Sequence, residues 1–170
     1  MVVERVNSTV RKDELFFHLI TLLREGTLNY RWRAAEALGE EGDQRAVGPL
    51  IEALSDPHVD VSWIAAKSLG RLGDPEAVPH LISMLDDDDK WQRIGAAEGL
   101  GGIADPEAVE SLATLLARDP DRLVREKAAW ALGEIGGDAA EDALLSAEGD
   151  ESERVRKSVL KSLEKLKKGK

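Results

Sequence analysis

The sequence contains no cysteine, few aromatic residues (4%) and no long apolar run. Without cysteine, the chain cannot form disulfides, thiolate zinc sites, iron–sulfur clusters or a cysteine nucleophile. No apolar run approaches the roughly 18 residues that a membrane helix needs, and the first residues lack the apolar block of a signal peptide. The sequence therefore predicts a cytoplasmic protein with no membrane partner.

The residues that are abundant favour helix. Alanine, leucine, glutamate, lysine and arginine dominate, and β-branched residues are sparse, so we expect an all-α fold. The formal net charge is −10, but residues 151–170 carry eight Lys/Arg against three Glu. The first 150 residues therefore hold an excess of acids. Because an acidic body repels phosphates, no nucleic-acid partner is expected.

A block of about 31 residues recurs five times. One leucine marks the block in every unit, at Leu38, Leu69, Leu100, Leu132 and Leu163, and the segment before it starts at Phe16, Val47, Val78, Val109 and Ala140. Each unit contains two patterns with apolar residues three and four positions apart, which predicts two helices. Gly-Asp and Asp-Pro steps between units predict a helix end followed by a helix start. The predicted organisation is a lead-in at 1–12 and one domain at 13–170, with repeats at about 13–43, 44–74, 75–105, 106–137 and 138–168, the last a C-terminal cap.

The recurring motif resembles a known family. The pattern AAxxLGxxGDxxAVxxLIxxL lies at Ala34–Leu54, Ala65–Leu85 and Ala96–Leu116, with alanine at the positions of Gly and Ile in the third copy. It is similar to the HEAT-like repeats of the phycobilin lyase type, within the HEAT/armadillo superfamily. The resemblance implies a right-handed α-α superhelix, or solenoid, of about five two-helix repeats. It also implies that the second helices line a concave surface. Such a resemblance specifies fold far better than function.

Helical geometry places a stripe of residues opposite the core on the second helices. At 100° per residue, the positions six, five and two before the marker leucine and two after it point away from the buried face. The candidate partner-binding residues on this stripe are Trp32, Arg33, Glu36, Trp63, Ile64, Lys67, Arg71, Ile94, Glu98, Lys127 and Trp130. Trp and Arg are enriched at interface hot spots, so the stripe predicts a groove for a peptide or helix. Alternatively, the tryptophans fill the seam between neighbouring helices.

Arginine recurs seven residues before the marker leucine, on the core side of the helix. The arginines are Arg31, Arg93, Arg125 and Arg156, and Ser62 interrupts the series. We expect a structural ladder in which these arginines pair with the aspartates between units, namely Asp43, Asp74, Asp105 and Asp138.

No pattern of catalytic, metal-binding or cofactor-binding residues is evident. Deoxyhypusine hydroxylase, a HEAT-like relative, holds iron with His-Glu pairs on its inner helices, and the corresponding positions here contain no such pair. Of the three histidines, His18 and His80 lie two units apart on equivalent helices, too far apart to share a metal. We therefore expect a non-enzymatic scaffold that binds a protein or peptide. Two alternatives remain: a tetrapyrrole or bilin lyase-type subunit or chaperone that binds a flat chromophore in the same groove, and a homodimer through the tryptophan patch.

Overall fold

The computed structural model describes residues 2–168, with side chains from residue 11 onward. This part of the chain contains helices and no strand. The helices are α1 (Val2–Glu25), α2 (Leu28–Glu41), α3 (Val47–Ala53), α4 (Val59–Leu72), α5 (Val78–Met84), α6 (Lys90–Ile103), α7 (Val109–Arg118), α8 (Arg122–Ile135), α9 (Asp138–Ser146) and α10 (Glu153–Lys168). Short 3₁₀ turns precede α3, α5 and α7, at Gln44–Ala46, Pro75–Ala77 and Pro106–Ala108. None of these helices is both long enough and apolar enough to cross a bilayer.

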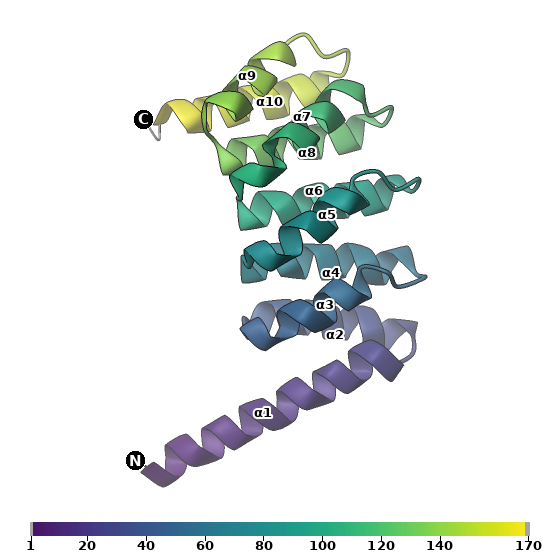
Figure 1. Cartoon of the computed structure of the whole chain (residues 1–170), viewed down its shortest axis with the longest axis vertical. Helices are drawn as coiled ribbons and strands as arrows, with labels where there is room; N and C mark the ends of the chain where they lie inside the picture. The colour runs from purple at the N-terminus through teal and green to yellow at the C-terminus, as the bar shows by residue number, and fades with distance from the viewer. Residues whose placement is uncertain (1, 169–170) are drawn as a thin grey trace.

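The helices stack in two rows (Figure 1). The second helices of the repeats, α2, α4, α6, α8 and α10, form one row, and α3, α5, α7 and α9 form the other. This arrangement is an α solenoid and confirms the predicted fold class. Helix α1 lies across the N-terminal end of the stack and packs on α2. It runs without a break through residue 12, where the sequence had predicted the end of a separate lead-in.

The turn between repeats is built as the Gly-Asp step predicts. Gly42 and Gly73 end their helices in the left-handed region, with φ of 69° and 70°. In the third repeat Ala104 takes the same conformation, at φ 60°, and is the only non-glycine residue with positive φ in the described chain. The following aspartate then caps the next turn: the carboxylate of Asp74 accepts the backbone N–H of Glu76 at 2.9 Å. Capping satisfies backbone donors that the helix itself cannot pair.

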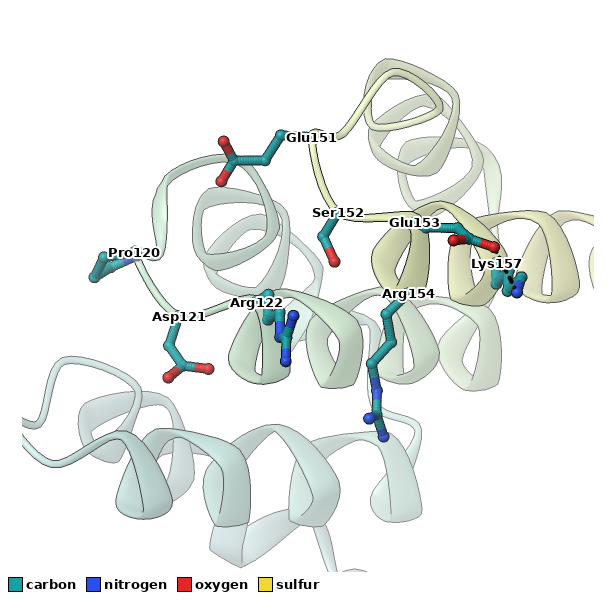
Figure 2. Close-up of a pocket in the computed structure, with 8 residues that line it drawn as sticks. All are labelled: Pro120, Asp121, Arg122, Glu151, Ser152, Glu153, Arg154 and Lys157. Carbon is teal, nitrogen blue, oxygen red and sulfur yellow. Dashed lines mark ion pairs between the residues drawn. The ribbon is translucent and has the colours of Figure 1, made fainter.

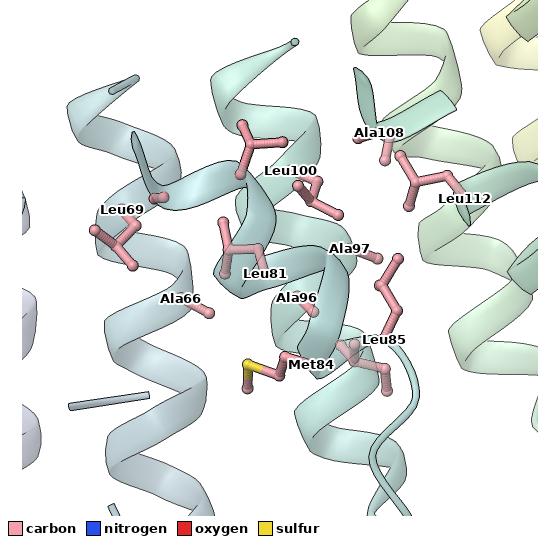
Figure 3. Packing of buried hydrophobic residues seen from close by; sticks show 14 of the residues in the cluster. Ala66, Leu69, Leu81, Met84, Leu85, Ala96, Ala97, Leu100, Ala108 and Leu112 are labelled. Carbon is pink, nitrogen blue, oxygen red and sulfur yellow. The ribbon is translucent and has the colours of Figure 1, made fainter. Parts of the chain in front are cut away.

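The core lies between the two rows. The marker leucines are buried in all five repeats, with small residues beside them. Figure 3 shows Leu81 of α5 between Leu69 of α4 and Leu100 of α6, with Met84 and Leu85 farther along the same core. Burying a leucine contributes about 2 kcal/mol. Much of this burial takes place between repeats, so each repeat gains stability by packing on its neighbours. The stack therefore holds the second helices as a rigid, regularly spaced surface.

Candidate functional site

The predicted arginine ladder exists, but its acidic partners differ from those expected. Three of the four arginines bind the aspartate in the loop between the two helices of the following repeat. The nitrogen–oxygen distances are 2.7 Å for Arg31–Asp56, 2.7 Å for Arg93–Asp119 and 2.8 Å for Arg125–Asp150. Each of these arginines also donates to a backbone carbonyl in the loop just before its own helix, as Arg125 does to Asp119 at 2.8 Å. The ladder therefore ties consecutive loops together, and Ser62 interrupts it as predicted.

The expected partners Asp43, Asp74 and Asp105 instead cap the turns between repeats, and Asp138 begins α9. The prediction was wrong because the arginine stands near the start of the second helix and the linker aspartate follows its end. At 1.5 Å per residue, these positions lie about 18 Å apart. Arg156 has no carboxylate partner within the described residues. It donates to the carbonyl oxygens of Asp150 and Glu151.

The middle of the second-helix row contains a pocket of about 270 Å³, which we call the central pocket. It is lined by Lys67, Gly70 and Arg71 of α4, Glu98 and Gly102 of α6, and Lys127 and Trp130 of α8. The structure thus brings together five of the predicted partner-binding residues. The other six lie outside it: Trp32, Arg33, Glu36, Trp63, Ile64 and Ile94.

The central pocket carries an excess of positive charge. Three cations and a single carboxylate line it. Glu98 is already engaged, since it pairs with Lys127 at 2.5 Å and accepts the indole N–H of Trp63 at 3.2 Å. Lys67 lies over the Trp63 ring, 4.8 Å from its centroid, and has no carboxylate partner in the described part of the chain. Arg71 reaches Glu40 only at 3.8 Å, on the exposed rim. The pocket can therefore accept an anionic group.

Glycine forms the floor of the central pocket. A Cβ atom on Gly102 would lie 2.7 Å from the carbonyl oxygen of Gly70, and one on Gly70 would lie 2.9 Å from that of Gly99. The backbones of α4 and α6 approach each other so closely only because neither residue has a side chain. Gly70 was not predicted as part of the site. Glycine directly follows four of the five marker leucines, so its presence at residue 70 does not distinguish this repeat.

The tryptophans are partly buried in the seams between second helices. The indole of Trp63 covers Gly95, where an added Cβ would lie 2.6 Å from Trp63 Cδ1, and Trp130 covers Gly101 in the same way. Trp91 is 45% exposed and its ring centroid lies 6.3 Å from that of Trp63. Trp63 and Trp130 therefore fill the seams between helices, as the alternative interpretation expected, and the peptide-binding groove stays a prediction.

Ile94 corrects the predicted stripe. It is only 3% exposed and belongs to the core. Its position, six residues before the marker leucine, lies on the flank of the helix, so a short aliphatic side chain there turns into the seam. On α2, Trp32 is half-buried, and the guanidinium of Arg33 lies 5.4 Å from its ring centroid. This pair sits apart from the central pocket.

A model of HEAT repeats matches residues 18–97 and 78–164. The chain belongs to the HEAT-repeat family. No curated protein sequence matches it. Among solved structures, it is similar to the complex of CpcE and CpcF of phycocyanin lyase from Nostoc sp. PCC7120, with 28% identity and a TM-score of 0.76 over 88% of this chain. The match covers 64% of that chain, so this HEAT-repeat chain spans less than two thirds of its length.

Two further structures share the fold alone. A designed armadillo repeat protein in complex with the peptide (KR)4 is 20% identical, with a TM-score of 0.67 over 96% of this chain and 86% of its own. Human deoxyhypusine hydroxylase is 18% identical, with a TM-score of 0.51 over 96% and 99% of the two chains. Among the described residues of the HEAT-repeat chain, no group of His, Asp and Glu is arranged to hold a metal ion.

A larger depression of about 820 Å³ lies between the N-terminal ends of α8 and α10 (Figure 2). It is lined by three cations and three carboxylates, with Pro120 and Ser152. Glu153 pairs with Lys157 at 2.7 Å, and Arg154 pairs with Glu126. Its charges are balanced, so this depression lacks the excess of positive charge that distinguishes the smaller central pocket.

Proposed function

We propose that this HEAT-repeat chain is a non-enzymatic protein-binding module whose second-helix face binds an acidic peptide or helix of a partner. The observation that carries the proposal is the central pocket, where Lys67, Arg71 and Lys127 surround one already engaged carboxylate beside Trp130. On a protein with a net charge of −10, this excess of cations is local. It would steer an acidic segment to this face and orient it there.

The size of the pocket favours side chains over an enclosed small molecule. Its 270 Å³ falls below the roughly 300–1,000 Å³ of sites that enclose drug-sized ligands. One or two side chains of a bound peptide would fit, with an apolar group on Trp130 and a carboxylate on the cations. Two similar structures, the CpcE–CpcF complex and the peptide-bound armadillo protein, hold a partner chain or peptide, which supports this use of the scaffold.

Binding of a model peptide tests the proposal. The probe is a fluorescein-labelled helical peptide with glutamates on one face and leucines on the other, and its control has lysines in place of the glutamates. We expect fluorescence anisotropy to report salt-sensitive binding of the glutamate peptide only. Lys67→Glu should weaken it roughly tenfold or more, the effect of losing one charged contact. Lys67 forms no ion pair with a described residue, so its replacement breaks none.

The matched control is Arg118→Glu, which makes the same charge change at an exposed site on α7, in the other row of helices. If Arg118→Glu weakens binding as much as Lys67→Glu, only the net charge matters, and the proposed site is wrong. Equal binding of the lysine peptide would also contradict the proposal.

A second candidate function rests on the 28% identity to the phycocyanin lyase structure. In this case the same surface would bind a tetrapyrrole, with Trp130 against the flat ring and Arg71 and Lys127 near its propionates. Titration with biliverdin distinguishes the two functions: a change in visible absorbance that Trp130→Ala abolishes would favour the chromophore. Sedimentation velocity tests the homodimer alternative, which would bury the exposed Trp91 beside Trp63.

A further inference from the structure

A separate pocket of about 410 Å³ lies between the second and third repeats, on the side of α3, α5 and the loops that follow them. We call it the outer pocket. Its lining includes Ser55, Ser83, Asp87 and Gln92, and it contains no lysine or arginine. None of these residues lines the central pocket.

The pocket between the first and second repeats is its counterpart, one repeat earlier. That pocket is lined by Leu23, Arg24, Pro49, Glu52 and Asp56, and adding 31 to each number gives Leu54, Ser55, His80, Ser83 and Asp87 of the outer pocket. In the earlier pocket Arg24 pairs with Glu52, and Arg31 binds Asp56. In the outer pocket both arginine positions are serine, Ser55 and Ser62, and Glu52 is replaced by Ser83. Only the aspartate remains.

That aspartate, Asp87, lacks the partner its equivalents have. One of its carboxylate oxygens accepts the backbone N–H of Asp89 at 2.8 Å, and among the described residues it forms no ion pair. Arg93 binds the backbone carbonyl of Asp87, but its Nε and Nη2 are committed to Asp119. The side chain of Asp119 is accordingly 3% exposed, whereas Asp87 is open to the outer pocket.

A second departure from the repeat occurs at the same place. Eight residues before the marker leucine, three other repeats have a fully buried valine, at Val61, Val124 and Val155. The third repeat has Gln92, whose Oε1 is buried and has no hydrogen-bond partner within the described chain. A buried amide oxygen without a donor is unfavourable, because it has lost water and gained nothing in exchange. Beside the carboxylate of Asp87, the outer pocket therefore has an amide oxygen that lacks a donor.

We propose that the outer pocket binds the guanidinium of an arginine side chain from a partner protein. In the pocket one repeat earlier, the equivalent space is filled by the chain's own Arg31. Its guanidinium donates two hydrogen bonds to Asp56 and a third to a backbone carbonyl. A guanidinium has five N–H donors in a planar fork, so it can pair with the Asp87 carboxylate and still donate to Gln92 Oε1. The site takes a cation and lies apart from the central pocket, which takes an anion.

The test uses the full chain and N-acetyl-L-arginine amide as the probe. The uncharged analogue N-acetyl-L-citrulline amide has nearly the same shape, and N-acetyl-L-lysine amide has the charge without the fork. We expect a saturable NMR shift of the Gln92 side-chain amide with the arginine probe, assigned by its loss in Gln92→Val. Asp87→Asn should weaken binding about tenfold or more. Asp86→Asn is the matched control, with the same charge change at the neighbouring exposed residue.

Ser62→Arg gives a second, independent test. The new arginine should occupy the outer pocket, abolish the response to the probe and raise the melting temperature. An absent or unsaturable shift, an equal response to citrulline or lysine, or an equal effect of Asp86→Asn would overturn the proposal. If Ser62→Arg does not fold, the comparison of Asp87→Asn with Asp86→Asn still decides it.

Discussion

Arg125 is the most buried arginine of the ladder, and removal of its ion pair with Asp150 should destabilise the fold strongly. The arginine side chain is 7% exposed and that of Asp150 is 10% exposed. Arg125 Nε and Nη2 donate to the carboxylate at 2.8 and 3.1 Å, and Nη1 donates to the carbonyl of Asp119. Arg125→Gln leaves a nearly buried carboxylate without its partner. We expect a loss of about 3 kcal/mol in the free energy of unfolding, as measured for broken buried pairs.

A double-mutant cycle isolates the pair. Arg125→Gln, Asp150→Asn and the double variant are unfolded in urea at pH 7, with circular dichroism as the readout. We expect a coupling energy of about 2 kcal/mol, since the pair makes two charge-assisted hydrogen bonds away from solvent. The exposed pair Lys157–Glu153 is the control, and its coupling energy should be much smaller because solvent screens it. A coupling below about 0.5 kcal/mol for Arg125–Asp150 would refute the reasoning.

The same pair gives the protein a defined sensitivity to acid. The hydrogen bond from Arg125 lowers the pKa of Asp150 in the folded protein, against an ordinary value of about 3.9 in the unfolded chain. A carboxylate with a depressed folded pKa contributes stability that is fully present above the unfolded pKa and is lost as the pH falls towards the folded pKa. The difference between wild type and Arg125→Gln should therefore be constant above about pH 5 and shrink below about pH 4.

Three other predictions concern the helix ends and the tryptophans. Ala104→Gly should stabilise the protein by about 0.5 kcal/mol in urea unfolding, because Ala104 has positive φ, whereas Gly73→Ala at the equivalent turn should cost about 1 kcal/mol; equal effects would contradict this account. Gly95→Ala places a Cβ 2.6 Å from an atom of the Trp63 ring and should cost roughly 1–3 kcal/mol by the same measurement. Trp91→Phe should remove the most red-shifted and most acrylamide-quenchable part of the emission, because Trp91 is 45% exposed; an unchanged quenching constant would contradict this.

The fold could be predicted because every repeat carries the same local signals. The marker leucine, the Gly-Asp step and the helical spacing recur with one period, so errors in one unit are corrected by the others. The partners of the ladder arginines could not be predicted in this way. The position of Arg125 relative to the core follows from helical geometry, but its partner depends on which loop of the next repeat lies nearest. That distance is set by the stacking, and each repeat contains at least two aspartates, such as Asp138 and Asp150, from which a partner could have been chosen.

The candidate site was predicted only as a set of residues on one face. Helical angles placed Lys67, Glu98 and Lys127 on that face, and they do line one pocket. The same angles placed Ile94 there as well, although it is buried. A residue on the flank of a helix is exposed or buried according to how closely the neighbouring helix approaches. That approach depends on glycines such as Gly70, whose contacts cannot be read from a single helix.

Equivalent positions of the repeats can be compared with one another, and a residue that differs from its equivalents can indicate a role other than packing. Substitutions at positions that only pack should be scattered and conservative. The second and third repeats instead replace a recurring arginine with Ser62 and a buried valine with Gln92, and both changes fall at one boundary, beside Asp87. Each change alone removes a favourable contact or buries a polar group. Their coincidence is understandable if a group from outside the chain supplies the missing donors. Ser62→Arg therefore distinguishes a binding site for an external group from a defect in packing that the fold tolerates. A large gain in stability with no loss of binding to any ligand would indicate the packing defect.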